Sequence, residues 1–371
     1  IPPSVRRTHF SGIDYVPVEE SSRPLIVGER TNVIGSRKFK KLITEEKFEE
    51  AAEIARRQVK AGAHILDVCL SNPDRHEIED MKRFLEKAIR MVKAPFMIDS
   101  TDPKVLEMSL SYCQGKSIIN SVNLEDGEEK FEQVVPIARK YGAALVVGCI
   151  DDDPVQAQAV TVERKLEIAK RSFEMLTEKY RMSAEDIIWD PLVFTCATGD
   201  KNYIGSAGQT ILGVTALKEH FPGTRTILGI SNVSFGLPEA GREVLNAVFL
   251  YHCTKAGLDL AIVSSEKLMR YASIPEEEKR LADDLLFNRG GDPIAAFAGR
   301  YKEKKKTVSK ERRPLDERLS HYIIEGTKDG LIEDLEEKRK NTAPLDIING
   351  PLMKGMDEVG RLFNNNELIV A

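Results

Sequence analysis

A short apolar run that ends in one acidic or amide side chain recurs along the chain. The clearest copy is Ala94-Pro95-Phe96-Met97-Ile98-Asp99-Ser100, and a helical pattern begins soon afterwards at Pro103. Apolar runs of this length between turn signals are typical of buried strands. Four further runs end in the same way, at Asp67, Asn120, Asp190 and Asn232. If the strands are parallel neighbours, these five polar ends form one wall.

The runs alternate with amphipathic helical patterns. Strands are predicted at 25–29, 63–68, 95–99, 117–120, 143–148, 187–190, 226–230 and 259–263. They consist of Val, Ile, Leu and Ala with little alternation, as expected when both faces of a strand are buried. About eight strand–helix units in about 250 residues predict an α/β fold, a closed (β/α)8 TIM barrel. An open doubly wound sheet is the alternative, but no glycine-rich dinucleotide fingerprint follows any strand.

Composition shifts along the chain predict four segments. Residues 1–24 are rich in Pro, Ser and Arg without periodicity and predict an N-terminal segment that wraps a surface. Residues 25–301 hold the barrel, and the charged stretch 302–313 is a linker. Residues 314–371 are all-helical and amphipathic. These short helices bury little alone, so we expect the start of a small, truncated helical bundle.

Composition also limits the function. The net charge of the 371-residue chain is −5 and no basic stripe stands out, which disfavours nucleic acid binding. No apolar run approaches the ~20 residues of a membrane span. Five scattered cysteines without a CxxC pair indicate a reducing compartment, so we expect a cytoplasmic protein. The chain begins at Ile1 and stops at Ala371 after an apolar run, which suggests a fragment of a larger polypeptide.

The active site of such a barrel lies at the C-terminal ends of its strands. Carboxylates accept hydrogen bonds from amidine-like N–H pairs, and Asn both donates and accepts. A wall of Asp and Asn suits a flat, nitrogen-rich heterocycle such as a pterin better than metal-assisted hydrolysis. Singly, such residues are more often turn formers or caps, but five strands end alike. The candidate residues are Glu29, Asn32, Asp67, Asp99, Asn120, Asp190, Ser231 and Asn232, with Asp151 just past strand 143–148.

Several of these motifs resemble a known family. The segment Gly28-Glu29-Arg30-Thr31-Asn32-Val33-Ile34-Gly35-Ser36 resembles the opening of the pterin-binding domain of cobalamin-dependent methionine synthases. The resemblance covers about residues 20–300, and the tail around Pro344–Met353 resembles the start of the helical cap of their cobalamin module. That tail distinguishes them from standalone relatives that methylate a corrinoid protein. The other matching motifs are Leu66-Asp67-Val68, Ile98-Asp99-Ser100, Ile119-Asn120-Ser121, Trp189-Asp190-Pro191 and Ser231-Asn232-Val233-Ser234-Phe235.

The resemblance implies a role for each matching position. Asp99 and Asp190 would bind the pyrimidine edge of the pterin, and Asn120 would add a hydrogen bond to the ring. Asn232 would lie near N5, which carries the methyl group. The supporting residues of the pocket floor would be Asp67, Glu29 and Asn32. The sequence departs from the family at Cys69, where relatives usually have Asn, at Ser264-Ser265, which replaces Asn-Ala, and in a slightly longer loop after Asp151.

The implied reaction is transfer of the N5-methyl group of 5-methyltetrahydrofolate to cob(I)alamin, giving tetrahydrofolate and methylcobalamin, one half-reaction of methionine synthesis from homocysteine. A tertiary amine is a poor leaving group, so N5 must gain positive character, and general acid help is typically worth roughly 10²–10⁴-fold. Asn232 is neutral; the hypothesis is that it stabilises protonated N5 as the catalytic residue, with the proton arriving through water.

The resemblance also implies partners and leaves alternatives open. The cobalamin-binding and homocysteine modules of the same polypeptide would be partners, and zinc is expected only in the homocysteine module, which has no match here. The alternatives are a standalone methyltetrahydrofolate:corrinoid protein methyltransferase, a dihydropteroate synthase-like enzyme and a non-enzymatic binding module. A dihydropteroate synthase would need a strand-end Lys or Arg for pyrophosphate, and none is convincingly placed.

Overall fold

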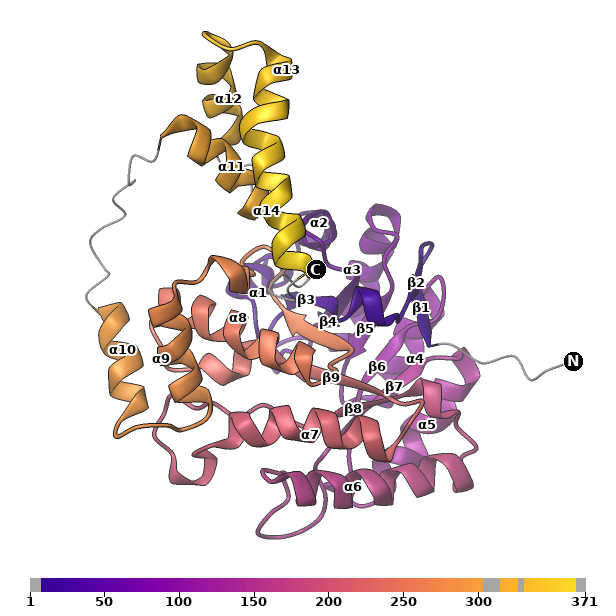
Figure 1. Ribbon diagram of the computed structural model, residues 1–371. Helices are drawn as coiled ribbons and strands as arrows, with labels where there is room; N and C mark the ends of the chain where they lie inside the picture. Colours follow the sequence, from indigo (N-terminus) through magenta and orange to yellow (C-terminus); the bar gives the residue numbers. More distant parts are fainter. Residues whose placement is uncertain (1–7, 303–313, 326–329, 365–371) are drawn as a thin grey trace, which may run out of the picture.

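Eight parallel strands close into a barrel in the computed structural model, which describes residues 8–302, 314–325 and 330–364. The ring closes where Leu260 of the last strand lies opposite Leu25 of the first. The predicted TIM-type barrel is therefore confirmed (Figure 1). In ring order the strands are β10 (Leu260–Val263), β3 (Leu25–Asn32), β4 (Ile65–Cys69), β5 (Phe96–Asp99), β6 (Ile118–Val122), β7 (Ala144–Gly148), β8 (Ile187–Asp190) and β9 (Arg225–Gly229).

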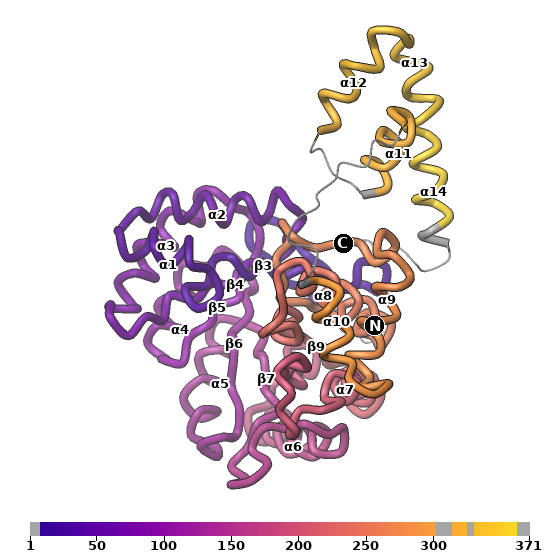
Figure 2. The backbone as a smooth tube through the Cα atoms, turned by 90° about the vertical axis from the view of Figure 1, so that its left-hand side faces the viewer, coloured from indigo at the N-terminus to yellow at the C-terminus, as the bar shows by residue number. Residues whose placement is uncertain are grey.

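Helices surround the barrel and cover the outer faces of its strands (Figure 2). Local signals set their ends: Asp102 caps the first turn of α4, with Pro103 at its first position, and Gly142 ends α5 in the left-handed conformation. The barrel helices are α1 (Arg37–Thr44), α2 (Phe48–Lys60), α3 (Glu77–Met91), α4 (Pro103–Tyr112), α5 (Glu129–Tyr141), α6 (Val162–Glu174), α7 (Ser206–His220), α8 (Glu239–Lys255), α9 (Glu276–Leu286) and α10 (Pro293–Lys302).

The barrel interior is a packed core below the site. Side chains such as Val27, Ile65, Met97 and Ile188 point inward and are fully buried. Large apolar clusters fill the space between the strands and the helices. The lower and middle layers are filled largely by apolar side chains, as is usual for this fold, so the space for a site is left at the C-terminal ends of the strands.

A short hairpin closes the opposite end of the barrel. Strands β1 (His9–Ser11) and β2 (Tyr15–Pro17) pair antiparallel. Phe10 is fully buried in the inner barrel core, and the backbone N–H of Ser11 donates to the carbonyl of Lys116, just before β6. The sequence predicts a segment that wraps a surface here but does not indicate the two strands, because three-residue strands carry no periodicity to detect.

The chain after the barrel is helical, as predicted. The helices are α11 (Leu315–Glu325), α12 (Leu331–Arg339), α13 (Pro344–Ile347) and α14 (Met353–Asn364), with a π-helical turn between the last two. They form a small bundle beside the barrel, and the Arg270 guanidinium donates to the carbonyl of Ile324 across the junction (Figures 1 and 2). Of the predicted linker, 303–313 lie outside the described residues, and so do 365–371 of the predicted cap.

Candidate functional site

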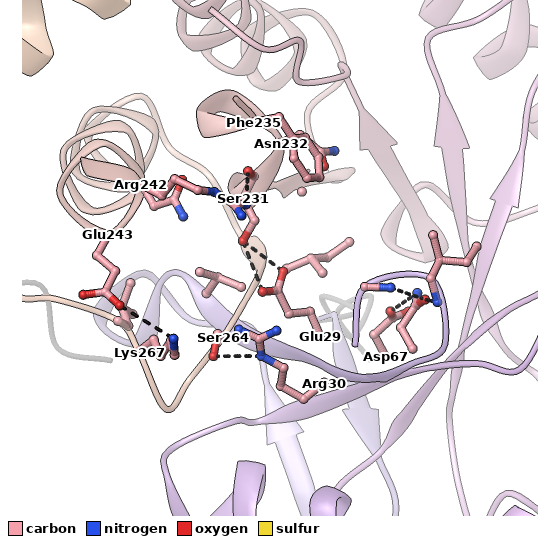
Figure 3. A pocket seen from close by; sticks show the side chains of 18 of the residues that line it. Glu29, Arg30, Asp67, Ser231, Asn232, Phe235, Arg242, Glu243, Ser264 and Lys267 are labelled. Carbon is pink, nitrogen blue, oxygen red and sulfur yellow. Dashed lines mark hydrogen bonds and ion pairs between the residues drawn. The ribbon is translucent and has the colours of Figure 1, made fainter. Parts of the chain in front are cut away.

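A cavity of about 460 Å³ opens at the C-terminal ends of the barrel strands. Its size falls in the range of small-molecule sites. Seven of the nine residues predicted from the sequence line it: Glu29, Asn32, Asp67, Asp99, Asn120, Ser231 and Asn232. Figure 3 shows Asp67 on one side of this space and Arg242, Glu243 and Lys267 on the other.

Asn32, at the end of β3, organises the acidic side of the cavity. Its Oδ1 accepts from the backbone N–H groups of Ile34 and Gly35, at 2.9 and 3.2 Å. These bonds identify the other amide atom as the donor nitrogen. Asn32 Nδ2 donates to Oδ2 of Asp67 at 2.9 Å and to Oδ2 of Asp99 at 3.3 Å. One amide group therefore holds two carboxyl groups from two other strands.

The two carboxyl groups resist ionisation. Burial raises the pKa of Asp67 well above its usual value, and the charge of Asp99 raises it further. Burial raises the pKa of Asp99 to about 6, against the lowering effect of its hydrogen bond with Asn32. Asp67 is only 2% exposed, and its Oδ1 has no hydrogen-bond partner among the described residues. A ligand that brings N–H donors would satisfy these oxygens.

Glu29 and Ser231 connect opposite ends of the barrel sequence. Ser231 Oγ lies 3.2 and 3.0 Å from the two carboxylate oxygens of Glu29. Gly28 makes room beside Glu29, since a Cβ there would stand 2.6 Å from Gln58 Oε1, which accepts from the backbone N–H of Arg30. The C-terminal end of β3 is therefore hydrogen-bonded both to α2 and to the turn after β9.

Asn232 lies in a 3-10 turn, η5 (Ile230–Ser234), directly after β9. A Cβ on Gly229 would lie 3.0 Å from Asn232 Nδ2, so the glycine leaves the amide its position. Arg242 of α8 braces the turn: its Nε donates to Ser234 Oγ at 3.2 Å and its terminal nitrogen donates to the Ser231 carbonyl at 3.4 Å. The Arg242 guanidinium also lies over the ring of Phe235, 5.0 Å from its centroid.

The sequence reasoning missed the basic side of the cavity. Arg30 donates from Nε to Ser264 Oγ at 3.3 Å, and Lys267 pairs with Glu239. Together with Arg242 these cations line the cavity near β10 and α8. Arg30 directly follows the strand-end residue Glu29, so its position in the sequence could have predicted its place at the site. The positions of Arg242 and Lys267 could not be predicted in this way, because they depend on how α8 and the loop after β10 pack.

Asp190 and Asp151 do not line the cavity. Asp190 is partly exposed at the end of β8, where its Oδ1 accepts from the backbone N–H of Leu192 at 2.9 Å, and burial raises its pKa to about 6. Asp151 is buried in the loop after β7 and forms an ion pair with Arg164. The structure therefore gives Asp151 a local partner, whereas Asp190 remains at the strand-end rim.

The described residues contain no group of three or more His, Cys, Asp or Glu side chains that could hold a metal ion. Nor, in the part of the chain that the structure describes, is there a helix long and apolar enough to cross a membrane. The site is thus built from carboxylates, amides and a few cations.

The barrel, with its polar wall of strand-end carboxylates and amides, has the features of a pterin-binding site. The family described as "Pterin binding enzyme" matches residues 28–264, and the chain belongs to this family. Residues 315–371 match a family described as "B12 binding domain". The bundle therefore corresponds to the second family and the barrel to the first.

Among named proteins, the chain is similar to methionine synthases. It is 37% identical over 366 residues to the methionine synthase of Mycobacterium leprae and equally to that of Mycobacterium tuberculosis. Each match covers 95% of this chain and 30% of the relative, so the chain spans about a third of their length. A solved dihydropteroate synthase of Xanthomonas albilineans with 4-aminobenzoic acid shares the fold at a TM-score of 0.51 and 17% identity, covering 70% of this chain and 94% of that one.

Proposed function

We propose that this chain binds 5-methyltetrahydrofolate in the strand-end cavity and transfers its N5-methyl group to cob(I)alamin, one half-reaction of methionine synthesis from homocysteine. The observation that carries the proposal is the pairing of two features in one chain. A cavity lined by Asp67, Asp99 and Asn120 suits the N–H groups of a pterin, and a B12-binding match follows the barrel. The second feature favours methyl transfer over dihydropteroate synthesis.

The acidic side of the cavity would receive the pyrimidine edge of the pterin. Asp99, as the carboxylate, accepts from the 2-amino group and the ring N–H, and Asn120 on the neighbouring strand adds a bond to the ring. Asp67 and Asn32 form the floor that fixes Asp99. Asp190, which lies at the end of β8 outside the cavity lining, would reach the ring from the rim. Charge-assisted hydrogen bonds of this kind are roughly twice as strong as neutral ones.

Asn232 would lie near N5. Because the side chain is neutral, it does not supply the proton; its carbonyl oxygen stabilises the N–H of protonated N5, with the proton delivered through water. Gly229 and the turn braced by Arg242 hold the amide in place. Glu29 accepts a hydrogen bond from Ser231, the residue that precedes Asn232.

Cobalamin would be held by the bundle and by a further cobalamin-binding module of the same polypeptide. The bundle fits an apolar ring, since it exposes several large apolar side chains: Ile332, Leu345, Ile348, Met353 and Met356. When bound, cobalamin supplies the nucleophile that accepts the methyl group. The barrel residues bind and orient the pterin with N5 toward the open mouth. Homocysteine, and the zinc expected with it, belong to another module.

A titration with 5-methyltetrahydrofolate, followed by addition of cob(I)alamin, tests the proposal. We expect saturable binding by calorimetry and loss of the cob(I)alamin absorbance as the methyl group transfers. Binding without transfer would mean that the bundle alone cannot present the acceptor to the barrel. A chain that bound 6-hydroxymethyl-dihydropterin pyrophosphate but no methylated folate would instead be a dihydropteroate synthase-like enzyme, and failure to bind any pterin would leave a scaffold module.

A further inference from the structure

A lysine is buried beside the end of β8, outside the cavity. Lys165 of α6 is 0% exposed, and its Nζ donates to two backbone carbonyls, those of Ala159 and Pro191, each at 2.6 Å. Among the described residues it forms no ion pair with a carboxylate. A buried ammonium is costly unless it is well hydrogen-bonded, so this position calls for an explanation beyond packing.

The space for this lysine is built into the neighbouring helix. A Cβ on Gly213 of α7 would stand 2.7 Å from Lys165 Cδ, so glycine leaves a channel for the aliphatic stem. The ammonium lies 5.7 Å from the centroid of the Phe194 ring. Lys165 thus bridges the loop before α6 and the loop after β8, and α7 leaves room for its side chain.

The turn that Lys165 holds is strained. Leu192 has φ 65°, in the left-handed region that a branched residue rarely adopts. Three hydrogen bonds fix the turn: Lys165 to the Pro191 carbonyl at 2.6 Å, Thr210 Oγ1 to the Leu192 carbonyl at 2.8 Å, and the Leu192 N–H to Asp190 Oδ1 at 2.9 Å. Such strain persists where the surroundings over-determine it, and it clusters at functional sites.

The last of these bonds points to the purpose of the turn, because it fixes the Asp190 carboxyl at the rim. The positive charge of Lys165 also favours the ionised form of Asp190, opposing the burial that raises its pKa to about 6. In return, Asp190 and Cys149 are the titratable groups that act on Lys165; burial outweighs both and lowers its pKa to about 8.

We propose that Lys165 is a positioning residue for pterin binding: by holding the Pro191 carbonyl it fixes the turn that orients Asp190 as a carboxylate toward the pterin. This inference rests on the proposed function, which assigns Asp190 to the pterin edge. Lys165 touches no substrate and acts only through Asp190.

The experiment compares dissociation constants for 5-methyltetrahydrofolate in the parent chain, Asp190→Asn, Lys165→Met and the double variant. We expect each single variant to bind roughly tenfold or more weakly, as for the loss of a charged hydrogen bond. Because Lys165 acts through Asp190, the double variant should bind no more weakly than Asp190→Asn. A purely structural lysine would give additive losses.

Two further measurements keep the test decisive if Lys165→Met folds poorly. Lys165→Gln retains one hydrogen-bond donor without the charge, and its affinity should fall between those of the parent and the Asp190→Asn variant. In the parent chain, affinity should decline as the pH rises through about 8, and this decline should vanish in Lys165→Gln.

Lys218→Met is the matched control: this partly buried lysine of α7 bonds Asp259 far from the site, so the substitution should lower stability without weakening binding by the folded protein.

The outcomes separate the two proposals. No binding by the parent chain would overturn the proposed function and this inference together. Equal binding by the parent and Asp190→Asn would remove Asp190 from the site, and the inference with it. Weak binding by Asp190→Asn alongside parent-like affinity in Lys165→Met and Lys165→Gln would overturn the inference alone.

Discussion

Asp67 and Asp99 accept hydrogen bonds from the same nitrogen atom, Nδ2 of Asn32, at 2.9 and 3.3 Å. The two carboxyls come from adjacent strands, and Asn32 comes from the strand on the other side of β4. Burial is the main cause that raises the pKa of both carboxyls, so both resist ionisation. For Asp99 the raised pKa is about 6.

Pterin affinity should therefore depend on pH. In the proposed function Asp99 must be ionised to accept two N–H bonds, and burial raises its pKa to about 6. At pH 5 only about a tenth of the Asp99 carboxyl is ionised. The apparent dissociation constant is therefore raised about tenfold by this group. Calorimetric titrations between pH 5 and 7.5 measure this slope. Asp99→Asn should bind weakly and lose the part of the slope that Asp99 contributes, leaving the part due to Asp190, whose pKa is also about 6. An unchanged slope would assign the titration to another group.

Replacing Asn32 by Ala should destabilise the folded chain by about 1–3 kcal/mol, because it leaves buried oxygens without a donor. The raised folded-state pKa values mean that these carboxyls favour the folded state most below about pH 4, and that this contribution is lost as the pH rises through about 6. In Asn32→Ala the amide that stabilises the charged carboxylates is missing, so the free energy of unfolding should fall more steeply as the pH rises. Urea unfolding at pH 5 and pH 8 measures it.

Asn246→Ala is the control for that experiment. Asn246 lines the same cavity, but its Oδ1 has no hydrogen-bond partner in the described structure. Its removal should change stability little at either pH. Equal losses of stability in Asn32→Ala and Asn246→Ala would show that the hydrogen bonds of the Asn32 amide to the two carboxyls do not stabilise the fold.

Asn232→Ala should reduce methyl transfer more than pterin affinity, because in the proposed function the amide acts on N5 only as positive charge develops there. A loss of roughly 10²–10³-fold in the transfer rate is expected for removal of one such polar group. Stopped-flow decay of cob(I)alamin gives the rate and calorimetry gives the affinity. Equal losses in the two quantities would make Asn232 a simple binding residue.

Gly229→Ala should displace the same amide without removing it. The new Cβ would lie 3.0 Å from Asn232 Nδ2, and the Gly229 φ of −77° suits any residue. We expect near-parent stability and roughly tenfold slower transfer, since small misplacements at a reacting centre are costly. Gly148→Ala, at the end of β7 with ordinary contacts of 3.7 Å or more, should leave the transfer rate unchanged.

Gly355→Ala should loosen the bundle alone. A Cβ there would stand 2.7 Å from the Ser320 carbonyl oxygen, so α14 must move away from α11, at a cost of about 1–3 kcal/mol. Gly360→Ala meets nothing within 4 Å and should stabilise the same helix. Amide hydrogen exchange over 315–325 should speed up only in the first variant, while pterin affinity stays constant in both.

The sequence was sufficient to predict the strand-end groups because each follows an apolar run that is long enough to identify a strand. Seven of those residues meet around one cavity, from Glu29 to Asn232. The same reasoning could not place Arg242 or Lys267, whose positions depend on tertiary packing. It also could not see that Asp151 is paired with Arg164, since an exposed and a paired carboxyl look alike in a sequence.

Between β3 and β4 the chain forms two helices, of which α1 ends at Thr44 and α2 begins at Phe48. Glu46 between them has φ 57°, and no glycine or proline marks this break in the sequence. The helix α1 starts directly after the Ser36 cap. Short helices with local caps and few apolar residues remain hard to separate from loops.

The pairing of β10 with β3 places Leu260 opposite Leu25, 235 positions earlier in the chain, and the hydrogen bond between Ser231 and Glu29 depends on it. The cavity therefore does not exist in any partial stack of strand–helix units. During folding, recognition of the pterin can arise only after the first and last strands have met. A fluorescent pterin added to a refolding reaction would consequently time the final closure of the ring rather than the formation of its parts.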